Sequence, residues 1–250
     1  MQLTNTVKQL LIINVIFYMG SIWVGDIAYD YLSLYYIDHP NFGVWQFVTH
    51  MFMHAKFPSI THIVFNMLGL VMFGSALESL WGSQKFLFFY ISSGLGAALL
   101  HTGVNYYHFH QGLDILIENG FAKEQILEVI NRGEYMQSWQ TLMSGKDFKN
   151  FIESYLIPAV GASGALYGIL VGFALSFPNA SLMMIFLPIP IKAKYFVPII
   201  VASDLYMGIS GTSIFGGGGI AHFAHVGGAI TGFLMAWFWK KNEFDKHRWN

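Results

Sequence analysis

Residues 158–178 read PAVGASGALYGILVGFALSFP, and this stretch decides how the rest of the chain is interpreted. Its two prolines enclose roughly 20 residues, which is about one membrane-helix length. Ser163 stands near the start of this helix, between Gly161 and Gly164, where neighbouring backbone can approach its hydroxyl. The unpaired N–H groups of a helix start also suit a developing oxyanion. A Gly-x-Ser-Gly sequence alone is more often a helix cap in a small-residue packing face, so a functional interpretation requires a partner elsewhere.

The composition predicts that the chain lies in a membrane. Hydrophobic residues make up 54% of the 250 residues and charged residues only 11%, and the mean hydropathy is +0.48. These values are typical of an all-α polytopic membrane protein and not of a soluble domain. The net charge of −1 argues against nucleic acid as a partner, and the absence of cysteine excludes a thiolate nucleophile.

Six apolar segments predict six transmembrane helices in one domain. Their approximate bounds are 10–28, 60–77, 86–100, 159–177, 195–208 and 220–239. The first segment offers no small-residue cleavage site, so we expect a retained span and not a signal peptide.

The segment 105–155, between the third and fourth helices, is rich in charged residues and predicts an insertion of short amphipathic helices. Two roles remain open for this insertion: it recognises substrate, or it is a solvated linker. The glycine-rich run 211–219 predicts a hinge or gate before the sixth helix.

The distribution of positive charge predicts the orientation. With six spans the two termini share one side, and the larger share of the 13 Lys and Arg residues lies there: Lys8, Lys85, Lys192, Lys194, Lys240, Lys241, Lys246 and Arg248. This bias places the termini in the cytoplasm. The starts of the fourth and sixth helices then lie toward the outer face.

Four histidine and asparagine residues draw attention around the second helix. His62 and Asn66 are four residues apart and share one helical face, which should turn toward the protein interior because polar groups in an apolar span need partners. They form either an interhelical hydrogen bond or a pair of donors to an oxyanion near Ser163. His50 and His54 have the spacing of a zinc pair, but no His-Glu-x-x-His pattern accompanies them, so we expect no metal and no other cofactor.

Glycines at spacings of four predict that the fourth and sixth helices touch. The stripes are Gly164, Gly168 and Gly172 on one helix and Gly228 and Gly232 on the other. Because both helices enter from the same side, they run parallel, and His225 meets Ser163. A histidine there can act as general base, and Tyr167 can pack its ring against the imidazole. The fourth and sixth segments contain no aspartate, so a Ser–His dyad is predicted and not a triad.

In this combination and order, these residues resemble the rhomboid family of intramembrane serine proteases. The similarity is carried by Gly161, Ser163, Gly164, Tyr167, Ala224, His225, Gly228, Gly232, His62 and Asn66, with Trp45, Glu78 and Gly82 as further matches. One departure is Gln46, which follows Trp45 where the family commonly has arginine.

The resemblance implies a six-helix serine endopeptidase of the bacterial type. Ser163 would be the nucleophile and His225 the general base, while His62, Asn66 and the Ser163 backbone N–H would hold the oxyanion. The remaining site residues, which would support these groups or contact substrate, are Tyr167, His50, His54, Gly161, Gly164 and Gly228.

The resemblance also implies partners and a location. Substrates would be single-span proteins in the lipid bilayer of the bacterial cytoplasmic membrane, cut near the outer end of a helix in regulated proteolysis, with the fifth span as gate. Two alternatives are a catalytically silent relative that binds or escorts membrane helices, and a small transporter with histidine proton relays.

Overall fold

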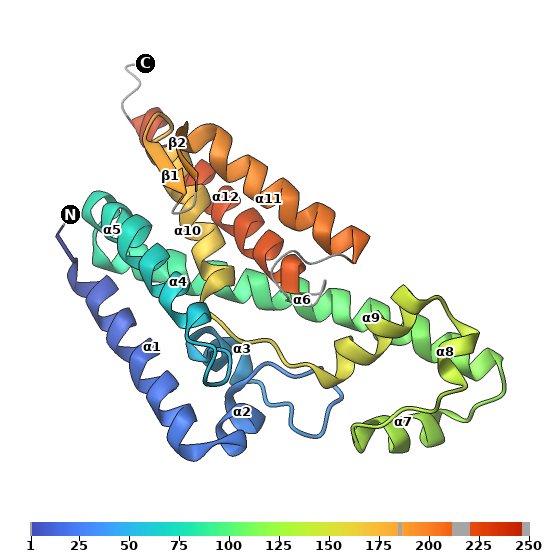
Figure 1. Ribbon diagram of the computed structural model, residues 1–250. Helices are drawn as coiled ribbons and strands as arrows, with labels where there is room; N and C mark the ends of the chain where they lie inside the picture. Colours follow the sequence, from blue (N-terminus) through green and yellow to red (C-terminus); the bar gives the residue numbers. More distant parts are fainter. Residues whose placement is uncertain (1, 185–186, 212–220, 247–250) are drawn as a thin grey trace.

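The computed structural model describes residues 2–184, 187–211 and 221–246. Helices form a bundle, and the start of α1 and the end of α12 lie toward one end of it while α7, α8 and α9 lie at the other (Figure 1). Apart from an antiparallel hairpin, the regular structure of the described residues is helical, which confirms the predicted all-α fold class. The predicted hinge lies outside the described residues except for Gly211.

The first half of the chain forms the elements that surround the long central helix. Their bounds are α1 Asn5–Val24, α2 Asp26–Leu32, α3 Gln46–Thr49, η1 His50–Phe52, α4 Thr61–Gly69, η2 Leu70–Gly74, α5 Ser75–Trp81 and α6 Ser83–Glu118. The three elements α4, η2 and α5 follow without a break, and Gly82 with φ 82° then turns the chain into α6.

The second half of the chain supplies the insertion and the last three long helices. Their bounds are α7 Lys123–Asn131, α8 Trp139–Leu142, α9 Gly145–Leu156, α10 Ser163–Ser176, β1 Ser181–Met184, β2 Leu187–Lys192, α11 Ala193–Ser210 and α12 Ala221–Lys246.

Three helical segments among the described residues are long and apolar enough to cross a membrane. They are Asn5–Val24, Thr61–Trp81 and Ser83–Glu118, and α10 is a shorter apolar helix. Large apolar side chains stay exposed along α1, α11 and α12, for example Ile16, Ile199 and Phe233. Such surfaces are unfavourable in water and suited to lipid, so the chain is an integral membrane protein. The six-span topology remains a prediction.

The helix that contains the third predicted span is longer than that span. The sequence places the end of the span near residue 100 and begins the insertion at 105, but α6 continues to Glu118. Polar residues in this part of α6 lower its hydropathy, yet two of them, His101 and Asn105, are buried. The first helix stop is Asn119–Gly120, where Gly120 takes φ 91°.

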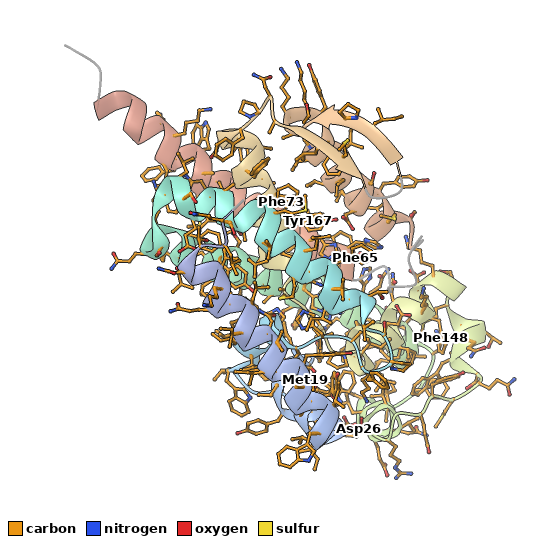
Figure 2. The ribbon with its side chains drawn as sticks, turned by 60° about the vertical axis from the view of Figure 1, so that its left-hand side comes forward. Met19, Asp26, Phe65, Phe73, Phe148 and Tyr167 are labelled. Atoms are coloured by element: carbon orange, nitrogen blue, oxygen red, sulfur yellow. The ribbon has the colours of Figure 1, made fainter. Side chains whose placement is uncertain are left out.

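The insertion has a hydrophobic core of its own. The end of α6 packs with α7, α8 and α9 around a buried cluster: Tyr36, Phe109, Leu113, Leu116, Ile126, Ile130, Trp139, Phe151 and Tyr155. A Cβ at Gly112 would lie 2.4 Å from Phe151, so the two helices are in close contact there. Figure 2 shows Phe148 of α9 at this end of the molecule, far from Tyr167 inside the bundle. The insertion is therefore a folded subdomain and not a loose linker.

The helices that carry Ser163 and His225 touch through glycine. A Cβ at Gly228 would lie 1.9 Å from the backbone oxygen of Gly164, and one at Gly232 would lie 2.5 Å from the Cα of Gly168. The contacts advance in the same direction along α10 and α12, so the helices are parallel. Backbones this close leave no room for side chains, and they hold the two helix starts in register.

Candidate active site

Ser163 begins α10 at the end of an extended segment. Ala159 pairs with Leu34 through two backbone hydrogen bonds of 2.9 Å, and Gly161 N–H donates to the backbone oxygen of His50 at 2.9 Å. Gly161 has φ 123°, a conformation that glycine adopts without strain, and the chain turns there into the helix. The segment before Ser163 is thus anchored to two other parts of the chain, which fixes the position of the hydroxyl.

His225 lies within hydrogen-bond reach of Ser163. The distance from His225 Nε2 to Ser163 Oγ is 2.9 Å. The Tyr167 ring is stacked on the imidazole, with centroids 4.3 Å apart and planes 8° from parallel. The structure therefore brings together the three residues that the sequence singled out on the fourth and sixth helices, and this geometry allows proton transfer from the hydroxyl to the imidazole.

His62 points its ring toward the same place. A Cβ at Gly161 would lie 2.8 Å from His62 Nε2 and 3.7 Å from Ser163 Oγ, so both atoms border this small volume. Ala55 N–H donates to His62 Nδ1 at 3.0 Å. A neutral imidazole that accepts at Nδ1 carries its proton on Nε2. His62 thus presents an N–H donor beside the Ser163 hydroxyl.

Asn66 is buried one turn further along α4, but its amide is engaged locally. Its Nδ2 donates to the backbone oxygen of His62 at 2.7 Å, and its Oδ1 has no hydrogen-bond partner among the described residues. The role of Asn66 toward an oxyanion remains a prediction.

His50 and His54 occupy different surroundings. His50 lines the cavity that contains Ser163, and its Nδ1 donates to the backbone oxygen of Gln46 at 2.8 Å. His54 is fully buried and packs edge-on against His62, with ring centroids 5.3 Å apart. His54 is thus placed to support His62, and His50 to face the cavity.

The buried histidines predict a loss of stability in acid. Burial lowers the pKa of both His50 and His54 to about 4, against about 6.5 in an unfolded chain. Between these values the unfolded state binds protons that the folded state does not, so the free energy of unfolding should fall as the pH drops from about 6.5 toward 4. Thermal unfolding in detergent across this range is the measurement. His54→Gln should flatten the decline between pH 7 and 5.5, and an equally steep decline in that variant would contradict the assignment.

Asp204 is the site residue that the sequence reasoning missed. It lies on α11 with an exposed fraction of 3%. Its Oδ1 is 3.2 Å from His225 Nδ1 and accepts from His222 Nδ1, and its Oδ2 accepts from the Tyr167 hydroxyl. The dyad expectation considered aspartates of the fourth and sixth helices only, whereas this one comes from the fifth. The signal was available, since a carboxylate within an apolar segment indicates a functional site by default.

A cavity of about 170 Å³ opens beside Ser163 and His225. Small residues of α6, α10 and α12, including Ala97, Gly164 and Ala224, form one part of its wall. Glu153 and Ile157, at the end of the insertion, form another. Burial raises the pKa of Glu153, and Lys149 lies 3.8 Å from its carboxylate. The insertion thus contributes directly to the space next to the serine.

Comparisons with known proteins point to one family. The rhomboid domain profile matches residues 41–242. Rhomboid protease AarA of Providencia stuartii is 27% identical over 202 residues, which are 77% of this chain and 54% of that protein. Rhomboid protein 1, mitochondrial, of Saccharomyces cerevisiae is 23% identical over 239 residues, 95% of this chain and 54% of that protein. Rhomboid-like protease 3 of Toxoplasma gondii is 24% identical over 209 residues, 84% of this chain and 57% of that protein.

The fold is an all-α membrane bundle with a serine and a histidine in contact inside it. With the domain match over most of its length, the chain belongs to the rhomboid family. It spans a little over half the length of the relatives named above.

Proposed function

We propose that this chain is an intramembrane serine endopeptidase that uses Ser163 and His225. The observation that carries the proposal is the 2.9 Å contact between Ser163 Oγ and His225 Nε2 at the edge of a cavity within an apolar bundle. Protease-named relatives support the same conclusion.

In this proposal the reaction proceeds through an acyl-enzyme. His225 Nε2 takes the Ser163 proton as Oγ attacks the scissile carbonyl carbon, and it returns that proton to the amine when the C–N bond breaks. Water then attacks the ester by the same proton transfer and releases the carboxyl product. Polar residues such as His50 would keep water in the cavity next to an otherwise apolar interior.

The oxyanion would be held by groups at the start of α10 and on α4. His62 Nε2 and Ser163 Oγ both border the position that a Cβ at Gly161 would take. The Ser163 backbone N–H belongs to the first helical turn and has no intrahelical partner to bond, and Asn66 is a further donor in this proposal.

Substrates are proposed to be single-span membrane proteins cut near the outer end of their helix. The proposed location is a bacterial inner membrane. In the proposed orientation both termini face the cytoplasm and Ser163 lies toward the outer face of the membrane. The fifth helix and the segment after it would give access, and no metal or other cofactor is required by the chemistry above.

The test is cleavage by the wild-type chain in reconstituted membranes. A panel of labelled single-span substrates is incubated with the protein, and the products are located by mass spectrometry. In parallel, a fluorophosphonate is used to label the active serine. We expect a cut near one end of the substrate helix and labelling at Ser163. Helix binding with neither cleavage nor labelling would support the escort function instead. Proton-coupled solute flux without cleavage would support a transporter.

His62 offers a prediction at the oxyanion position. His62→Ala should lower kcat by about 10²- to 10³-fold, because one charge-stabilising donor is lost in the transition state. KM should change little, since the donor acts mainly on the developing charge. Val64→Ala, on the exposed face of the same helix, is the control and should keep wild-type kcat. A variant that loses binding but keeps kcat would place His62 in substrate recognition.

A further inference from the structure

Resting on the proposed function, we propose that Asp204 is a positioning residue that holds His225 in its reactive form. Asp204 sits on α11, between Ser203 and Leu205, in a helix whose other residues are mostly apolar. A buried carboxylate is costly unless its oxygens accept hydrogen bonds, so its partners identify its role. Three described side chains reach it, and two of them, Tyr167 and His225, are already in the site.

The hydrogen bonds define the tautomer of His225. An ionised carboxylate only accepts, so the 3.2 Å contact from His225 Nδ1 to Asp204 Oδ1 requires a proton on Nδ1. In the neutral ring Nε2 then carries a lone pair, and this atom faces Ser163 Oγ at 2.9 Å. In the opposite tautomer Nε2 would hold a proton and could not accept another. Asp204 therefore favours the one form of the ring that can act as base.

Two further donors hold the carboxylate itself in place. The Tyr167 hydroxyl donates to Oδ2 while its ring is stacked on His225, and His222 Nδ1 donates to Oδ1 from one turn earlier on α12. The imidazole is thus fixed at its edge by Asp204 and over one face by Tyr167. Rotation of the ring away from Ser163 would break both contacts.

Charge balance gives Asp204 a second effect. When His225 takes the Ser163 proton, the ring becomes an imidazolium between the negative carboxylate and the developing oxyanion. The carboxylate keeps its charge throughout, and the proton passes only between Oγ, Nε2 and the leaving amine. The other titratable groups around the ring are His222 of α12, Tyr167 of α10 and His62 of α4, with His101 of α6 lining the same cavity. His50 and Glu153 also line the cavity, and among the described residues Asp204 is the acidic group within hydrogen-bond distance of the His225 ring.

The first test is Asp204→Asn in the full chain, assayed in liposomes. We expect kcat to fall by about 10²-fold or more with KM within about twofold, and fluorophosphonate labelling of Ser163 to slow in parallel. Asp114→Asn, the same substitution at an exposed position of α6, should behave as wild type. Unchanged kcat and labelling in a folded Asp204→Asn variant would overturn the proposal while leaving the proposed protease intact.

A second measurement uses the wild-type chain and so does not depend on how the variant folds. Histidine ¹⁵N NMR, assigned by comparison with His225→Gln, should show His225 protonated at Nδ1 and unprotonated at Nε2. The opposite tautomer would overturn the proposal, whatever the protein's activity.

A bound metal is the competing use of the same residues. The possible ligand atoms of Asp204, His222 and His225 all lie within 4.8 Å of one another. If activity is lost in EDTA and restored by zinc, the carboxylate serves a metal and the positioning role is wrong. Full activity in EDTA, together with the Nδ1 tautomer, is the expected result.

Discussion

Ser163→Ala is expected to lower the cleavage rate by about 10⁴-fold or more, because it removes the atom that would form the acyl-enzyme. The helix should stay intact, since alanine is a good helix former and the N-cap of α10 is Ala162 and not Ser163. His225→Gln should cause a loss of similar size. The double variant should be no slower than either single variant, because the two groups act as a unit in one proton transfer.

Ser176→Ala is the matched control, since it makes the same substitution at the other end of α10. It should cleave at the wild-type rate. Initial rates in liposomes, with thermal unfolding of each variant, separate loss of chemistry from loss of fold. Residual cleavage within tenfold of wild type in Ser163→Ala would assign the nucleophile to another residue.

Gly228→Ala is expected to destabilise the fold by about 3 kcal/mol or more, which is the upper part of the range for overpacking. The added methyl would lie 1.9 Å from the backbone oxygen of Gly164, and a backbone atom cannot rotate away as a side chain can. The α10 and α12 backbones must therefore separate, which would also lengthen the contact between Ser163 and His225.

Gly103→Ala is the control for the general effect of alanine in a helix. This position on α6 has no described heavy atom within 4 Å of an added Cβ, so the substitution should be neutral or stabilise by about 0.5–1 kcal/mol. Thermal unfolding in detergent and the yield of folded protein are the measurements. A Gly228→Ala variant with unchanged unfolding temperature would mean that the helices are not in backbone contact.

Local sequence patterns were sufficient to predict the main features of the helix bundle. The apolar segments and the glycine spacing of four predicted that α10 and α12 would meet, and from this the contact between Ser163 and His225 followed. The apolar segments and the glycine stripes each depend on residues a few positions apart, and at this range the periodicity of the sequence predicts local structure. The structure shows the positions of Ser163 and His225 and the contact between them, whereas their catalytic roles remain proposals.

Contacts between segments that are distant in the sequence could not be predicted from such local patterns. The end of α6 was assigned to the insertion as one of its short amphipathic helices, because Asn105 and the charged residues after it lower the hydropathy, and the continuous helix from Ser83 to Glu118 was not expected. The hairpin β1–β2 lies between two predicted spans, and Pro188 and Pro190 within β2 leave no strand signal in the sequence. Asp204 was overlooked because its partners come from α10 and α12, and no spacing within α11 indicates which helices will be its neighbours.

The cavity wall contributed by the insertion has a consequence for selective inhibition. In the proposed mechanism Ser163, with His225 as base, would react with any electrophile that resembles the scissile carbonyl, so the two residues give little basis for distinguishing one rhomboid from another. Glu153 comes from α9 and lines the same cavity of about 170 Å³. A serine-reactive compound with a cationic arm long enough to reach this carboxylate would gain a contact that depends on residues 105–155. The insertion therefore offers an inhibitor a contact beside the serine that Ser163 and His225 alone do not provide.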